Sequence, residues 1–234
     1  MEIGEILIDA FKYPLENIKA MGIYLILVIA TAMVMVIPGI VIGIGSKQDS
    51  FPLSIIACIF GFIILMILLL LLEGYLLDVV KTGINRGNKL PEIDFKRQFL
   101  NGIKLLALAI IYMGAPIILL ACLATLNKIL IWIGILIIIL ALLAFLMAQC
   151  RLAITDSITE ALIFEESVND IFKIGFFKLI VLLIVFAVIG YAIYIIGNLL
   201  QQNSQIIGIL FISILSIYLG LTQARGYGLL YSNI

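Results

Sequence analysis

The chain has 234 residues, of which 65% are apolar and only 12% are charged, and its mean hydropathy is +1.31. A soluble domain has about 45–50% apolar and about 25% charged residues. The composition therefore excludes a water-exposed globular fold and predicts a single transmembrane domain over residues 1–234. The formal net charge is zero, so no overall basic field is present to attract nucleic acid.

The first predicted element is an amphipathic helix over residues 3–19. Its apolar side chains recur at helical spacing, whereas its charged side chains face elsewhere, as is typical of a helix lying in the membrane interface. The apolar positions are Ile3, Ile6, Leu7, Ala10 and Phe11.

Six apolar runs follow, each about 20 residues or longer and none with a charge near its centre. They cover residues 20–45, 53–72, 103–126, 129–150, 176–197 and 205–224. Helices are predicted, because lipid leaves an open sheet edge without hydrogen-bond partners. The expected fold class is therefore all-α, a polytopic bundle of six transmembrane spans. An alternative is that the third and fourth runs form a re-entrant hairpin.

The charged residues predict an orientation. Of the fourteen Lys and Arg residues, twelve fall in the N-terminal segment, in the long connections after the second and fourth spans, or at the C-terminal end. The other two are Lys47 and Lys128, in short connections. Because Lys and Arg accumulate in cytoplasmic loops, we expect a multi-pass cell-membrane protein with both termini in the cytoplasm.

The spans also fall into a threefold pattern of helical hairpins, each preceded by a cytoplasmic amphipathic stretch. The second and third stretches are residues 90–104 and 155–178. Asp94 is the expected N-cap of a helix that starts at Phe95. Ser167 followed by Asp170 resembles a capping box, which predicts a helix start there.

Each returning span leaves the membrane through polar side chains, and these are the candidate site. They are Glu73, Gln149, Arg151, Gln223 and Arg225. Ionisable groups inside a bundle are costly and tend to mark function. Three interpretations remain open: side chains resting in the headgroup layer, an ion pair of Glu73 with Arg151 or Arg225, and a ligand site.

The motifs of common catalytic sites are missing from this sequence. It has no histidine, and Cys58, Cys122 and Cys150 each stand alone in an apolar run. It has no GxxxxGK[ST] loop and no GxSxG elbow. We therefore predict no catalytic, metal-binding or cofactor-binding residues and a chain that is not an enzyme.

Several motifs between residues 73 and 112 carry a family resemblance. They lie in Glu73–Lys81, Gly87–Glu92 and Phe99–Lys104, and include a Gly-Tyr helix end, a Leu-Pro-Glu turn and a Gly-Ile-Lys start to the next span. The chain resembles an uncharacterised, largely archaeal family of multi-pass membrane proteins designated only as a domain of unknown function. Phe95 departs from the tryptophan that members often carry there. The resemblance implies coverage of nearly the whole chain and no known activity.

Three functional hypotheses follow. The first is a non-enzymatic membrane-embedded module, whose partners are the lipid bilayer and either further copies of itself or another membrane protein. The second is a transporter or permease-like protein with a path between the hairpins. The third and least supported is an intramembrane enzyme. A polar cavity at the exits would favour transport, and a closed apolar core would favour the module.

Overall fold

The computed structural model describes residues 1–45, 51–89 and 91–234, without the side chains of residues 20, 35–45, 51–54 and 57. Lys47 therefore lies outside the described residues. Within them, all regular secondary structure is helical. The helices are α1 (Ile3–Glu16), α2 (Ile18–Gly45), α3 (Phe51–Ile84), α4 (Phe95–Leu126), α5 (Leu130–Thr155), α6 (Ile158–Ala161), α7 (Phe164–Ile174), α8 (Phe176–Asn203) and α9 (Gln205–Tyr231).

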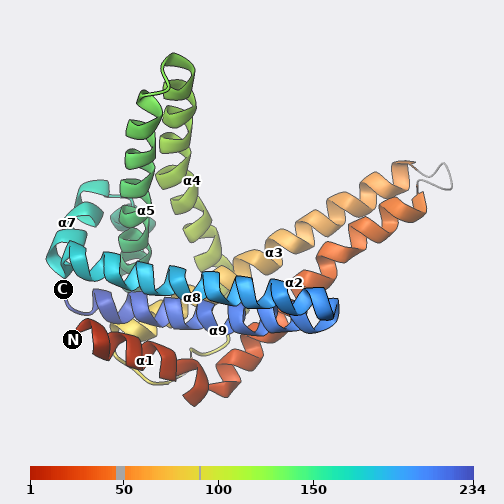
Figure 1. The fold of residues 1–234 in the computed structure, drawn as a ribbon, viewed down its shortest axis with the longest axis horizontal. Coiled ribbons are helices and arrows are strands. Elements are labelled where there is room, and N and C mark those ends of the chain that lie inside the picture. The colour runs from red at the N-terminus through yellow and green to blue at the C-terminus, as the bar shows by residue number, and fades with distance from the viewer. Residues whose placement is uncertain (46–50, 90) are drawn as a thin grey trace.

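Three hairpins diverge from a common base: α2 with α3, α4 with α5, and α8 with α9 (Figure 1). In the described part of the chain, α3, α4, α5, α8 and α9 are each long and apolar enough to cross a bilayer. The sixth span would be α2, whose 28 residues continue into the segment without described side chains. These features confirm the predicted all-α fold of apolar, membrane-spanning hairpins.

The amphipathic stretches take two forms. The first and third are separate helices, α1 and α7, and α1 meets the described start of α2 at 76°. The second is continuous with α4, and its predicted N-cap is confirmed, because the Asp94 side chain accepts a hydrogen bond from the Arg97 N–H. The predicted start at Ser167 is wrong: α7 begins at Phe164, and the Ser167 hydroxyl is buried against Tyr112.

The returning helices extend beyond the predicted spans. The third helix, α3, continues to Ile84, so the first part of the expected loop is helical. Tyr75, Val79 and Val80 are buried in this extension, and their burial explains why the helix continues past the membrane. We call this packed region the basal core. It comprises the C-terminal parts of α3, α5 and α9, together with α1, α7 and the first turns of α4 and α8.

The distal parts of the hairpins expose large apolar side chains, such as Phe60, Trp132 and Ile206. Water would not tolerate that surface, whereas lipid tails would. The exposed apolar hairpins and the buried basal core thus divide the protein into a lipid-facing part and a tightly packed base.

Two glycine contacts bring α3 and α4 together at the base. A Cβ on Gly74 would overlap the backbone of Gln98, and a Cβ on Gly102 would overlap the backbone of Leu70. Leu70 and Gly74 are four residues apart on α3, and Gln98 and Gly102 are four residues apart on α4. The two backbones therefore touch along one helical turn. Small residues at such crossings allow close packing in membrane helices.

Candidate functional site

Three of the five predicted site residues line one central cavity. Glu73 comes from α3, Gln149 from α5 and Gln223 from α9, and the cavity volume is about 260 Å³. Each residue occupies the corresponding place in its hairpin, where the returning helix enters the basal core. The structure therefore brings together the polar exits of the three sequence repeats.

The central cavity has an uneven chemical lining. Leu76, Leu105 and Leu146 form part of its wall beside the three polar side chains. Among its lining residues, which all belong to the described part, none is Lys or Arg. Within the described residues, no Lys or Arg nitrogen lies within 4.0 Å of the Glu73 carboxylate. The cavity thus offers a carboxylate and two amides with no neighbouring cation.

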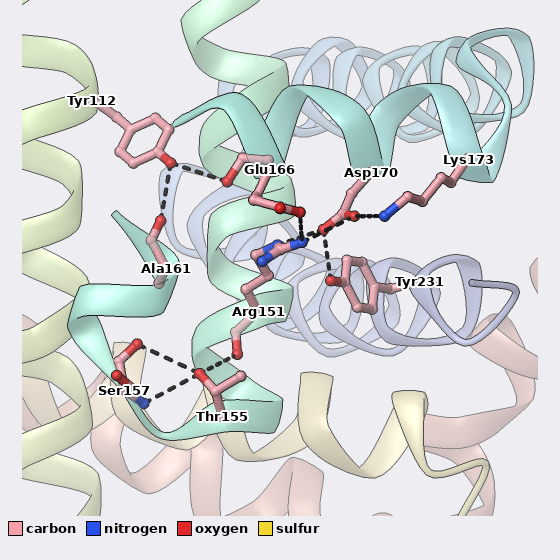
Figure 2. A network of polar contacts seen from close by, with 10 residues as sticks. Tyr112, Arg151, Thr155, Ser157, Ala161, Glu166, Asp170, Lys173 and Tyr231 are labelled. Atoms are coloured by element: carbon pink, nitrogen blue, oxygen red, sulfur yellow. Dashed lines mark hydrogen bonds and ion pairs between the residues drawn. The ribbon is translucent and has the colours of Figure 1, made fainter. Parts of the chain in front are cut away.

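Arg151 lies outside the cavity, in an ion-pair network with α7 (Figure 2). Its guanidinium donates to both carboxylate oxygens of Asp170, at 2.6 and 3.2 Å, and to Glu166 at 2.8 Å. The Tyr231 hydroxyl at the end of α9 donates to Asp170 at 2.8 Å, and Lys173 lies 3.4 Å from it. Asp170 is 1% exposed, so this buried carboxylate joins α5, α7 and α9.

Arg225 lies in a second network and is itself 1% exposed. It donates to the Asp9 carboxylate of α1 at 2.8 Å. It also donates to the backbone carbonyls of Thr82 and Gly87, at 3.2 and 2.6 Å. Carbonyls in the last turn of a helix lack intrahelical partners, and a cation there is favourable. Arg225 therefore caps the C-terminal end of α3 and links α1 to it.

The interpretation in which Glu73 forms an ion pair with Arg151 or Arg225 is wrong. Arg151 pairs with Asp170 and Glu166, and Arg225 pairs with Asp9. These partners could not be predicted from the sequence. Asp9 and Asp170 lie on amphipathic helices, whose polar faces carry charged residues whether or not these have an ion-pair partner. Arginine's several donors suit such branched contacts better than a single pair.

A third network was also missed, because it lies in the stretch expected to be a loop. The buried carboxylate of Asp78 on α3 accepts hydrogen bonds from Arg97 at 3.1 Å and from Gln98 at 3.3 Å, both in the first turn of α4. Asn101 on the next turn lies 3.5 Å from it.

Together the three networks form a closed ring. The returning helix of each repeat is bonded to the amphipathic segment of the next: Asp78 to Arg97, then Arg151 to Asp170, and finally Arg225 of the third repeat to Asp9 of the first. The central cavity lies between the three returning helices that this ring holds together. The ring therefore has a structural role, and the cavity is the candidate site.

The Asp170 network predicts a pH dependence of stability. Burial raises the pKa of this carboxyl, but the hydrogen bonds from Arg151 and Tyr231 and the charge of Arg151 outweigh burial and leave its pKa lower than usual. A group whose pKa is lowered by folding contributes stability above its unfolded pKa, which is about 3.9 for Asp. That contribution is lost as the pH falls below this value toward the folded pKa.

We therefore expect wild type to lose more stability than Asp170→Asn when the pH is lowered from 6 to 3. The measurement is the melting temperature of both proteins in detergent across this range. The difference between them should be constant above about pH 4 and narrow below it. A difference that stays constant down to pH 3 would show that Asp170 is not the titrating group.

The fold and site define a multi-pass helical membrane protein built from three hairpins around a polar cavity. The chain belongs to the family described as protein of unknown function DUF4013, which matches residues 57–201. This match confirms the predicted family of unknown function. It includes the Asp78 network and the Arg151 network apart from Tyr231, whereas Asp9, Gln223 and Arg225 lie outside it.

The uncharacterised protein MJ1189 of Methanocaldococcus jannaschii is 31% identical over 126 residues. That alignment covers 47% of this chain and 44% of the relative, so the chain matches less than half of the relative's length. No solved structure matches this chain.

Proposed function

We propose that this chain is a non-enzymatic integral membrane protein that binds a ligand in its central cavity. The observation that carries the proposal is the meeting of Glu73, Gln149 and Gln223 in one cavity. A concave site with a few convergent polar groups is the usual form of a binding site. The ring of ion pairs supports the same function, because a rigid frame holds the three side chains in place.

The runner-up is a permease with a path between the hairpins. The polar cavity at the exits is the feature that was expected to favour transport, and it would be the inner end of such a path. A neighbouring cavity of about 560 Å³ extends outward between α3, α4 and α5. Among the described residues that line it, the polar side chains are Glu73 and Gln149, which it shares with the central cavity, and the others are apolar. A polar solute would find no continuing polar surface there, which favours binding over conduction.

The orientation and the partners belong to the same proposal. With both termini in the cytoplasm, the central cavity lies near the cytoplasmic face of the cell membrane. The exposed apolar hairpins support the lipid bilayer as the main partner. Further copies of this chain, or another membrane protein, would contact the same hairpin surfaces.

The proposal is tested by labelling a cysteine placed at Gln223, after Cys58 and Cys122 have been replaced by alanine. Cys150 remains as a buried internal control. We expect Gln223→Cys to react with a membrane-impermeant methanethiosulfonate in inside-out vesicles and not in intact cells. The matched control is Thr222→Cys, one residue away and fully buried, which should stay unreactive.

Each outcome of the labelling bears on one part of the proposal. Absence of labelling at Gln223→Cys both in inside-out vesicles and in delipidated protein in detergent would overturn the open central cavity and with it the proposed function. Labelling in intact cells and not in vesicles would reverse the orientation. Equal labelling of Thr222→Cys would mean that the basal core is not closed around the cavity.

A further inference from the structure

The central cavity adjoins the neighbouring apolar one. We call the latter the apolar cleft; Met66, Leu70, Leu106, Ala109 and Phe145 are among its lining residues. Glu73, Leu105 and Gln149 line both cavities, so the two lie side by side at these three side chains. The space they enclose together has a polar end in the basal core and an apolar end between the first two hairpins.

The dimensions of this space suit an elongated ligand. The apolar cleft alone, at about 560 Å³, falls in the size range of about 300–1,000 Å³ that is usual for small-molecule sites. Seven helical positions separate Glu73 from Met66, which is about 10 Å along α3. An apolar chain starting near Glu73 could therefore follow two helical turns between α3 and α4.

The setting favours a lipid over a water-soluble molecule. The cleft is lined by residues of α3, α4 and α5. The hairpins to which these helices belong diverge from the base (Figure 1) and expose apolar side chains. Glu73 lies at the inner end of the apolar run of α3, at the depth expected for headgroups. A membrane lipid can enter this cleft from the side without leaving the bilayer.

The charges select the kind of headgroup. Glu73 supplies a carboxylate, and Gln149 and Gln223 supply amide oxygens that accept hydrogen bonds. Arg151, Arg225 and Lys104 lie within two residues of cavity-lining positions, and they are already paired with Asp170, Asp9 and Asp156. Lys81, which follows Val80, lines a different pocket. A carboxylate beside apolar walls binds a cationic hydrogen-bond donor favourably and repels an anion.

We propose that the central cavity and the apolar cleft together bind one membrane lipid whose headgroup carries an ammonium group. The ammonium group lies at Glu73, Gln149 and Gln223, and one acyl chain occupies the cleft beside Leu106 and Ala109. This inference rests on the proposed function, for which it names the class of ligand.

The test compares dioleoyl phosphatidylethanolamine with dioleoyl phosphatidylglycerol, which have the same chains. Binding to the purified full-length protein in detergent micelles is measured by native mass spectrometry over a lipid titration. We expect Glu73→Gln to weaken binding of phosphatidylethanolamine about tenfold or more, because it removes a charge-assisted hydrogen bond. Binding of phosphatidylglycerol should be unchanged. The matched control, Glu160→Gln, changes an exposed carboxylate outside both cavities and should alter neither.

A second variant tests the position of the acyl chain independently of charge. Ala109→Phe fills the apolar cleft and is expected to abolish binding of phosphatidylethanolamine. Ala187→Phe, on the exposed side of α8, adds the same ring outside both cavities and should leave binding intact.

The proposal is overturned if Glu73→Gln leaves binding of phosphatidylethanolamine unchanged or weakens both lipids equally. It is also overturned if Ala109→Phe still binds that lipid as wild type does. Labelling at Gln223→Cys separates the two levels of inference. If the cysteine is labelled but lipid selectivity is absent, only the ligand class is wrong, whereas a cysteine that stays unlabelled in delipidated protein in detergent removes the binding cavity itself.

Discussion

Replacing Asp170 by alanine is expected to destabilise the protein by about 3–5 kcal/mol, the usual cost of breaking a buried ion pair from one side. The carboxylate is 1% exposed and receives hydrogen bonds from Arg151 and Tyr231. Its removal leaves the Arg151 guanidinium, whose side chain is 17% exposed, without its main partner. The α7 helix would also lose the contacts that Asp170 makes with α5 and α9, although Glu166 would still contact Arg151.

The chain provides its own reporter for this measurement. Cys150 is fully buried in the basal core, next to Arg151. With Cys58 and Cys122 replaced by alanine, reaction of Cys150 with a fluorogenic maleimide during heating records the opening of that core. The melting temperature from this assay should fall sharply in Asp170→Ala.

Glu166→Ala is the matched control, because Glu166 binds the same arginine at 2.8 Å but is 45% exposed. Exposed ion pairs contribute about 0–1 kcal/mol, so this variant should melt close to wild type. Equal losses in Asp170→Ala and Glu166→Ala would show that burial of the pair does not determine its contribution. The ring would then be a set of ordinary surface contacts.

Gly102→Ala is expected to be the most disruptive small substitution in α4. Its new methyl group would overlap the backbone of Leu70, and a backbone cannot turn aside as a flexible side chain can. Overpacking in cores costs about 1–3 kcal/mol, and a clash with backbone should lie at or above the upper end of that range. The α3–α4 crossing would open, and Asp78 would separate from Arg97.

Gly114→Ala is the control on the same helix, where a Cβ would meet no atom within 4 Å. Alanine is favoured over glycine inside a helix by about 1 kcal/mol, so this variant should be neutral or slightly stabilised. Melting temperatures from the Cys150 assay compare the two directly. Similar effects of Gly102→Ala and Gly114→Ala would contradict the close helix crossing.

The stability experiments and the lipid-binding experiment test different parts of the protein: the contacts between the helices in the first case and the central cavity in the second. The Asp170 and Gly102 variants act on the contacts that hold the returning helices together. Glu73 belongs to no ion pair among the described residues, so its replacement should alter ligand binding without the same loss of stability. A lipid bound at Glu73 would in turn stabilise wild type by mass action.

The sequence alone predicts that the apolar hairpins lie in lipid and that the fold is all-α. Apolar runs of about 20 residues or more have only one stable form in lipid, the helix, so length and hydropathy alone predict the hairpins. The repeat also predicted which polar positions correspond to one another. Of the five residues that it identifies, Glu73, Gln149 and Gln223 share a cavity, whereas Arg151 and Arg225 do not line it.

Which charged side chains form ion pairs, and which face the cavity, depends on the tertiary packing. Asp9 and Arg225 are 216 residues apart, and no local pattern relates them. Their pairing depends on the chain closing a ring through three hairpins, and such contacts follow from packing rather than from helical periodicity. The same packing buries Asp170 against Arg151 and leaves Glu73 facing a cavity, so the partner of a polar residue could not be predicted from its position in the sequence.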